Sequence, residues 1–159
     1  MKISLRPFTS CDLETCEKWA RDIEAEQFQS RYYPRSFNGK DISGNDLLRC
    51  WYIILVDDEE VGTVWLEKNT ADAVVGILGI MIGRKEKFGK GIGRIAIFQA
   101  IEQARDQLGY CSVELNVRKG NIRAIACYQH CGFVAIREGI KISKDGKEVP
   151  YQTMKLDLD

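Results

Sequence analysis

A glycine-rich loop is the part of this sequence best suited by residue type to hold a ligand. Residues 88–93 read Phe-Gly-Lys-Gly-Ile-Gly, and they follow a short β-branched run at residues 77–82. Glycines let backbone N–H groups crowd onto a ligand without Cβ atoms in the way. A helix that begins here adds unpaired N–H groups and the positive end of its dipole. The loop therefore predicts a phosphate or pyrophosphate site, with a solvated surface loop as the alternative.

Further along the chain, three residues have the types and the spacing of a second binding surface. Asn121, Ala124 and Tyr128 are three and four positions apart, so they share one face of a predicted helix. The Asn121 amide can donate and accept hydrogen bonds, and Ala124 leaves room for a close approach. The Tyr128 phenol can give a proton to a leaving group. The alternative is structural, with Asn121 as a helix cap and Tyr128 as a core aromatic residue.

Hydrophobic periodicity predicts a mixed α/β domain whose elements position both groups. The helix after the glycine loop places Ile97, Ile101, Ala104 and Leu108 on its inner face and ends at Gly109. The sheet is expected to have about seven strands, mostly antiparallel and flanked by helices. We predict strands at residues 3–6, 51–56, 61–67, 73–82, 111–117, 133–142 and 149–158, and helices near residues 10–23, 93–108 and 121–132.

Composition limits the class of protein. The 159 residues have no net charge and no apolar run of the roughly eighteen residues that a membrane span needs. We expect one cytoplasmic domain over residues 1–159, with neither a membrane nor a nucleic-acid partner. Six cysteines occur without a C-x-x-C pair and His130 is the only histidine, so we predict buried free thiols, with disulfides or a zinc site as the alternative, and no metal. Residues 1–69 carry 13 acids and 9 bases, whereas residues 70–159 carry 10 and 14. That division suits a cationic substrate and an anionic cofactor.

On these two segments the sequence resembles the GNAT superfamily of acetyl-CoA-dependent N-acetyltransferases. The family's Arg/Gln-x-x-Gly-x-Gly/Ala loop corresponds to residues 88–93. Phe88 departs from Arg or Gln and resembles the branch with an aromatic residue before Gly-Lys-Gly, which includes ribosomal-protein N-terminal and polyamine acetyltransferases. The second matching segment comprises Glu114-Leu115-Asn116-Val117, Asn121, Ala124-Ile125, Tyr128 and Gly132-Phe133.

The resemblance implies the GNAT fold and a binding mode for acetyl-CoA. The backbone of Ile80, Met81 and Ile82 would pair with the pantetheine arm like an added strand. Asn121 and Ala124 would lie along the same arm, and Tyr128 would protonate the departing thiolate. Asn116 stands where some relatives have a glutamate, so it could position a water but not act as a base. The pyrophosphate would be held by Lys87, Phe88, Gly89, Lys90, Gly91, Ile92, Gly93 and Arg94.

The acceptor half of the site is expected in the irregular region 24–46, which includes a turn at Asn38-Gly39. Tyr32 and Tyr33, with Glu24 and Glu26, fall where relatives build an acceptor pocket. An acidic, aromatic pocket would suit a cationic amine, such as a polyamine, an aminoglycoside, a lysine or a peptide N-terminus. No general base is assigned; the carboxylates considered are Glu114, Glu24, Glu26 and Glu67. Dimers are common among relatives, so a homodimer is one expected assembly.

Two other functions fit part of the same sequence pattern. Residues 91–96 fit G-x-G-x-x-A, and Glu114 follows about twenty residues later, as in a dinucleotide-binding fingerprint. However, several basic residues separate these glycines from the preceding strand, and the motif follows three antiparallel strands. The other alternative is a CoA-binding module that has lost turnover, against which the presence of Tyr128 argues. A Walker-type loop is excluded because no Gly-Lys-Ser/Thr occurs.

Overall fold

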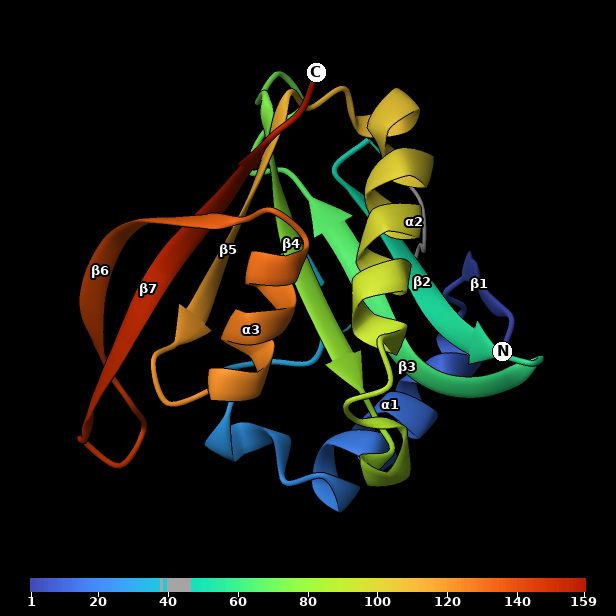
Figure 1. The fold of residues 1–159 in the computed structure, drawn as a ribbon, viewed down its shortest axis with the longest axis horizontal. Helices are drawn as coiled ribbons and strands as arrows, with labels where there is room; N and C mark the ends of the chain where they lie inside the picture. Colours follow the sequence, from blue (N-terminus) through green and yellow to red (C-terminus); the bar gives the residue numbers. More distant parts are fainter. Residues whose placement is uncertain (38, 40–46) are drawn as a thin grey trace.

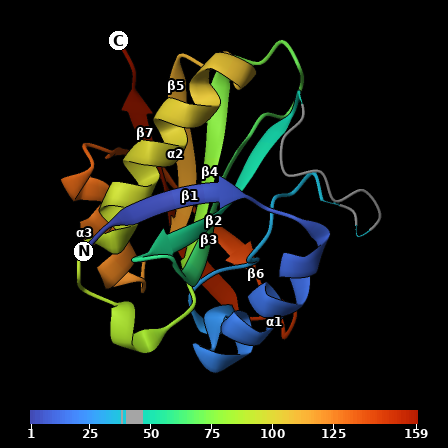
Figure 2. The same cartoon turned by 90° about the vertical axis from the view of Figure 1, so that its right-hand side faces the viewer.

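A seven-stranded sheet with helices on both faces forms the framework of the molecule (Figures 1 and 2). The computed structural model describes residues 1–37, 39 and 47–159, so Asn38 of the predicted turn lies outside the described residues. The strand order is β1-β2-β3-β4-β5-β7-β6. All neighbouring strands are antiparallel except β4 and β5, which are parallel.

The order of elements confirms the predicted mixed fold. Most helix and strand boundaries differ from the predicted ones by one or two residues. The helices are α1 (Leu13–Asp22), α2 (Ile92–Leu108) and α3 (Ile122–His130), with 3-10 turns at Ser10–Asp12, Ala25–Gln27 and Lys85–Lys87. The strands are β1 (Ile3–Pro7), β2 (Arg49–Val56), β3 (Glu59–Glu67), β4 (Val75–Ile82), β5 (Ser112–Arg118), β6 (Val134–Ile142) and β7 (Glu148–Asp157).

The central strands are buried on both faces because α2 and α3 cover one side of the sheet and α1 covers the other (Figure 2). On β2, Tyr52 and Ile54 pack into the core beneath α2, whereas Trp51 and Ile53 pack toward α1. This explains why β2 has an almost continuous apolar sequence instead of an alternating one. The core therefore fixes β3, which lies next to β2, and β4, which lies next to β3, from both sides.

Helix α2 follows the predicted pattern closely. Ile97, Ile101, Ala104 and Leu108 are all buried against the sheet. The helix ends where Gly109 adopts the left-handed conformation, with a φ of 72°, and its N–H donates to the Arg105 carbonyl at 2.7 Å. Glycine is favoured in this conformation because it has no Cβ to clash with the backbone. The long buried face fixes where the helix begins, and therefore where the glycine loop lies.

Strands β4 and β5 separate after a short pairing. Their parallel register runs only from Val75–Ser112 to Ile77–Glu114. Toward the lower end of Figure 1 the two strands spread apart, near α3 and the start of α2. The other edge of β4 stays paired with β3 up to Ile82. Among the described strands, none pairs with the β5-facing edge of β4 beyond Ile77, so its polar groups there are available to a ligand.

Candidate functional site

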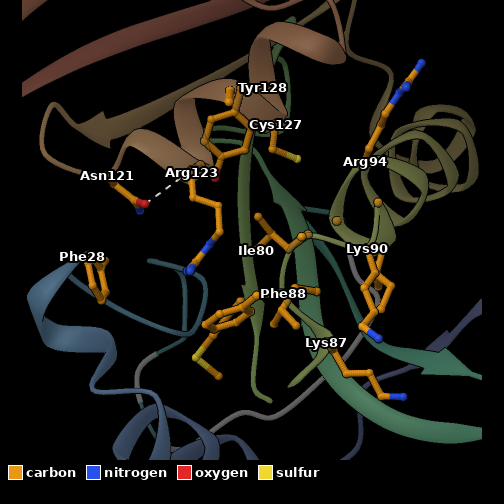
Figure 3. Close-up of a pocket in the computed structure, with 18 of the residues that line it drawn as sticks. Phe28, Ile80, Lys87, Phe88, Lys90, Arg94, Asn121, Arg123, Cys127 and Tyr128 are labelled. Carbon is orange, nitrogen blue, oxygen red and sulfur yellow. Dashed lines mark hydrogen bonds between the residues drawn. The ribbon is translucent and has the colours of Figure 1, made fainter. Parts of the chain in front are cut away.

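A cavity of about 440 Å³ lies beside the glycine loop, and we call it the glycine-loop cavity (Figure 3). Its walls come from the end of β4, the loop and first turn of α2, one side of α3, and residues 23–29. The structure brings together here all the residues predicted to hold the cofactor: Ile80, Met81, Ile82, Lys87, Phe88, Gly89, Lys90, Gly91, Ile92, Gly93, Arg94, Asn121, Ala124 and Tyr128. Their individual roles as ligand contacts stay a prediction.

The loop is shaped by backbone conformations that only glycine adopts readily. Gly89 and Gly91 have φ angles of 71° and 79°, and Gly91 is the N-cap residue of α2. A Cβ at either position would meet no atom within 4 Å, so the requirement is the positive φ and not lack of space. Lys87 and Lys90 add positive charge on the same loop (Figure 3). An anion at this position would meet the helix N-terminus and two ammonium groups.

Helix α3 presents Asn121 and Tyr128 to the cavity, as the spacing predicted. The Asn121 side chain also accepts a hydrogen bond from the Ala124 N–H at 3.3 Å, so it caps the helix as well. Tyr128 is half-buried and its ring meets Phe133 edge-on, with 6.0 Å between centroids. Asn121 therefore caps the helix and Tyr128 packs against the core, as the structural alternative stated, while both residues also line the cavity.

The Tyr128 phenol stays protonated over a wide pH range. Burial raises its pKa above the ordinary value of a tyrosine, and the neighbouring Cys127 and Cys131 raise it further. Cys127 also lines the cavity, and its pKa is lowered chiefly by a hydrogen bond with Cys131 and by the charge of Arg94. All six cysteines are free thiols, but Cys11 and Cys111 are exposed, so the predicted burial is wrong for these two. A protonated phenol in a partly dry site is suited to donate a proton.

Arg123 is a cavity residue that the sequence reading missed. Its guanidinium lies 3.7 Å from the centre of the Phe88 ring, an arrangement in which the cation is attracted by the aromatic face (Figure 3). Phe88 belongs to the glycine loop and Arg123 to α3, so the contact ties the two segments together. Phe28 and His130 also line the cavity without having been predicted. No spacing in the sequence links Arg123 to Phe88.

A second cavity, of about 370 Å³, adjoins the first, and we call it the cationic cavity. Four basic residues line it: Arg31, Arg35, Arg118 and Lys141. The two cavities share Phe28, Gln29, Ile80, Asn121 and Tyr128. The phenol and the end of β4 therefore stand where the two cavities meet.

Asn116 lines the cationic cavity but not the glycine-loop cavity. Its side-chain oxygen accepts a hydrogen bond from the Thr153 hydroxyl at 2.6 Å, across the β5–β7 pair. The amide NH₂ is thus the part of the side chain left to donate to a water or a substrate. This arrangement suits the positioning role inferred from the sequence.

The residues expected to form an acceptor pocket, Tyr32, Tyr33, Glu24 and Glu26, line neither cavity. The turn at Ala25–Gln27 directs Ala25 inward and leaves both glutamates exposed. Both tyrosines pack against the core on the α1 side of the sheet. Propensity patterns could not reveal these directions because the region has no regular periodicity.

The expected acidic lining also differs from what is observed. Glu67 is the only carboxylate among the described residues that line the cationic cavity, and it is 4% exposed. Its two oxygens accept hydrogen bonds from the backbone N–H groups of Arg35, at 2.8 Å, and Ser36, at 3.1 Å. Glu114, another carboxylate considered as a base, pairs with Arg137 at 3.0 Å and lines neither cavity.

Comparison with known protein families decides what kind of site this is. The acetyltransferase (GNAT) family model matches residues 13–133. This chain belongs to the GNAT acetyltransferase family. The GNAT protein is therefore an acetyl-CoA-dependent N-acetyltransferase, and acetyl-CoA is its acetyl donor. The match spans both segments on which the resemblance rested, and it removes the dinucleotide-binding alternative.

Solved structures agree with this fold. Spermidine N-acetyltransferase from Vibrio cholerae, in complex with CoA and spermine, is 20% identical, with a TM-score of 0.79 over 98% of this chain and 95% of that one. An aminoglycoside acetyltransferase in complex with coenzyme A and kanamycin is 18% identical, with a TM-score of 0.75 over 98% and 95%. A GNAT acetyltransferase from Streptococcus pneumoniae is 18% identical, with a TM-score of 0.72 over 99% and 100%. No curated protein matches this GNAT sequence.

Two further features concern the described residues of this GNAT chain. No helix there is both long enough and apolar enough to cross a membrane. Nor do three or more His, Cys, Asp or Glu side chains converge, in that part of the chain, on a point where a metal ion could bind.

Proposed function

We propose that this GNAT protein transfers an acetyl group from acetyl-CoA to the primary amine of a small molecule, with Tyr128 as the general acid. The observation that carries the proposal is the position of Tyr128, which lines both cavities. A group placed there can reach the sulfur of a donor in one cavity and face an amine in the other. The crystallised relatives include complexes with spermine and with kanamycin, which supports an amine acceptor.

The glycine-loop cavity would hold the donor through groups already in place. The free edge of β4 at Ile80–Ile82 offers backbone N–H and C=O groups to the amides of the pantetheine arm. Gly89, Gly91 and the start of α2 offer N–H groups to the pyrophosphate, with Lys87 and Lys90 adding charge. The positive-φ glycines fit this assignment because open space remains above them for phosphate oxygens.

The chemistry follows from the protonation states of the groups. Bound acetyl-CoA supplies a thioester carbonyl carbon, which the lone pair of a neutral amine attacks as the C–S bond breaks. Tyr128 Oη gives its proton to the departing sulfur, and its raised pKa keeps that proton available at neutral pH. The proton that the amine loses returns through water to the phenol.

No side chain is assigned as the general base. Glu67 is the only carboxylate in the described lining of the cationic cavity, and each of its oxygens accepts one hydrogen bond from a backbone N–H, which gives it a structural role. Asn116 cannot accept a proton at neutral pH, but its NH₂ group can hold a water beside the amine. We therefore propose that the amine reacts in its neutral form after losing a proton to water.

The first test separates donor binding from turnover. Calorimetry should show that acetyl-CoA binds and that NADH does not, and thiol release should appear when an accepted amine is added. Tyr128→Phe should lower kcat by about a hundredfold, the usual contribution of a general acid, while leaving acetyl-CoA affinity nearly unchanged. An equal loss of both would assign Tyr128 a structural role and refute its place in the mechanism.

Leaving-group and pH dependence sharpen this test. If Tyr128 protonates the sulfur, the Phe variant should lose less activity with an acetyl thioester of a more acidic thiol, because that thiolate leaves unaided. The wild-type kcat should show no fall from Tyr128 ionisation below about pH 10, since the phenol's pKa is raised and not lowered. A loss independent of the thiol would count against the general acid.

A further inference from the structure

The cationic cavity brings together basic side chains from three separate parts of the chain. Arg31 and Arg35 follow the turn at Ala25–Gln27, Arg118 ends β5, and Lys141 lies near the end of β6. They are close enough to interact: Lys141 is exposed, but partial desolvation lowers its pKa, and the charges of Arg31, Arg35 and Arg118 lower it further. Burial and then Arg35 likewise lower the pKa of Arg31. These cations repel one another in the protein without a ligand.

The protein supplies little to compensate this repulsion. Within the described part of the chain, none of the four cations forms an ion pair with a carboxylate. Glu67 faces the same cavity, but both of its oxygens accept hydrogen bonds from the Arg35 and Ser36 backbone. That carboxylate anchors the arginine-bearing segment, so among the described lining residues one negative charge faces four positive charges.

Two of the cations are also held in place by neutral partners. Arg118 donates to the Glu26 carbonyl at 2.9 Å, and the Lys141 ammonium donates to the Ser30 hydroxyl at 3.1 Å. These bonds tie β5 and β6 to residues 26–30 and aim the charges at the cavity that they line. Neutral anchors orient the cations without neutralising them. Such an arrangement stabilises an anion bound among them.

We infer that the acceptor is a small amine that also carries an anionic group, a carboxylate or a phosphonate, bound by the cations of this cavity. The inference deepens the proposed function and rests on it for the position of the amine near Tyr128. A cavity of about 370 Å³ fits a small molecule and not a polypeptide. The same lining disfavours polyamines, because their several positive charges would be repelled by the four cationic side chains.

The cations also assist the chemistry. Nearby positive charge disfavours an ammonium ion and favours the neutral amine, which is the form that attacks the thioester. The anionic group of such a substrate is attracted to the four cations, and this attraction offsets the repulsion of its amine. The remaining positive charge still favours the neutral form of that amine. The absence of a free carboxylate among the described lining residues is then consistent with turnover that needs no basic side chain.

The test uses matched pairs of amines that differ only in the anionic group. The pairs are γ-aminobutyrate with γ-aminobutyramide, and alanine with alaninamide; aminopropylphosphonate, putrescine and a short peptide with an acidic first residue complete the panel. Binding is measured calorimetrically on the CoA-saturated protein, which needs no turnover. The values of kcat/KM come from thiol release with acetyl-CoA. We expect at least one acid-bearing member to bind, and to react, about tenfold or more better than its amide.

A charge variant links this preference to the cavity. Lys141→Gln should reduce the ratio of kcat/KM for the acid to kcat/KM for its amide about tenfold, because the anion loses one of its cationic partners. Lys144→Gln is the matched control, since Lys144 is exposed in the β6–β7 turn and lines neither cavity. It removes the same charge three residues away and should leave the ratio unchanged. An equal change in both variants would contradict a local anion site.

Each outcome tests one part of the proposed site. Binding of an acid-bearing amine without thiol release would support the anion site and overturn the proposed acetyl transfer. Equal or faster turnover of the amides or of putrescine would overturn the anion site and leave acetyl transfer standing. Preference for the acidic peptide over every free amino acid would overturn the small-molecule acceptor. If no member of the panel binds or reacts, the inference is wrong. Preference between carboxylate and phosphonate identifies the anion.

Discussion

The two cavities that meet at Tyr128 are built in different ways. The glycine-loop cavity owes its anion-binding character to backbone groups and to a contiguous segment, residues 87–94, which supplies eight of its lining positions. The cationic cavity owes its character to side chains that come from five different strands and from the segment before β2. Neighbouring residues in the sequence form much of the first cavity, whereas the second cavity forms only when the fold brings distant segments together.

This difference predicts that the donor side tolerates more side-chain substitutions than the acceptor side. A backbone cradle tolerates change in most side chains, provided that Gly89 and Gly91 keep their positive φ angles. A side-chain cavity changes its charge with any one substitution. The relatives crystallised with spermine and with kanamycin have the same fold as this GNAT protein at about 20% identity or below. The acceptor therefore has to be inferred from this chain's own lining.

The largest effect on the difference between the two cavities is expected from a carboxylate placed beside the backbone N–H groups of the glycine loop. Gly91→Glu should weaken acetyl-CoA binding about a hundredfold or more, because a negative charge would face the phosphates at the N-cap of α2. The measurement is calorimetric titration with acetyl-CoA. Unchanged affinity would refute the assignment of the loop.

Two variants separate charge from backbone strain at that position. Gly146→Glu places the same residue at a φ of 82° in the β6–β7 turn, which lines neither cavity, and should keep donor affinity. Gly91→Lys keeps the strain and adds bulk but reverses the charge, so its loss of affinity should be smaller than that of Gly91→Glu. Melting temperatures of the three variants show whether strain alone accounts for the change.

A smaller effect is expected where the core meets the cationic cavity. A Cβ on Gly79 would overlap the Trp65 indole, and both residues line that cavity. Gly79→Ala should therefore lower the free energy of unfolding by about 1–3 kcal/mol, the usual cost of overpacking. It should also raise the KM of the amine more than the dissociation constant of acetyl-CoA, as measured by denaturation and by thiol release.

Gly120→Ala provides the control for this substitution. A Cβ there would meet no atom within 4 Å, and Gly120 has no positive φ. Its stability and its KM values should stay close to those of the wild type. A comparable loss in both variants would show that the effect of Gly79→Ala does not come from the indole.

The smallest predicted effect concerns the contact that joins the glycine loop to α3 in the glycine-loop cavity. Arg123→Gln removes the guanidinium over Phe88 and should weaken acetyl-CoA binding about two- to fivefold, as expected for an exposed cation–π contact. A double-mutant cycle with Phe88→Leu should give a coupling free energy of about 0.5–1 kcal/mol. Additive losses would mean that each side chain acts alone.

Much of the fold could be predicted because its signals are local. The inner face of α2, the end of that helix at Gly109 and the N-cap at Asn121 each depend on residues within a few turns. The glycine loop and the face of α3 were recognised for the same reason. Their meeting in one cavity follows from the split between β4 and β5, which no periodicity encodes.

By itself, then, the sequence determined the strands, the helices, the glycine loop and many, but not all, of the residues that line the glycine-loop cavity. Only the tertiary structure decided that Arg123 lies over Phe88, and that Tyr32 and Tyr33 pack into a core. It also decided that Arg118 and Lys141 join two arginines from the segment before β2. The physical reason is distance along the chain: backbone conformation depends on neighbouring residues, whereas the charge of a cavity depends on which remote side chains the sheet brings together.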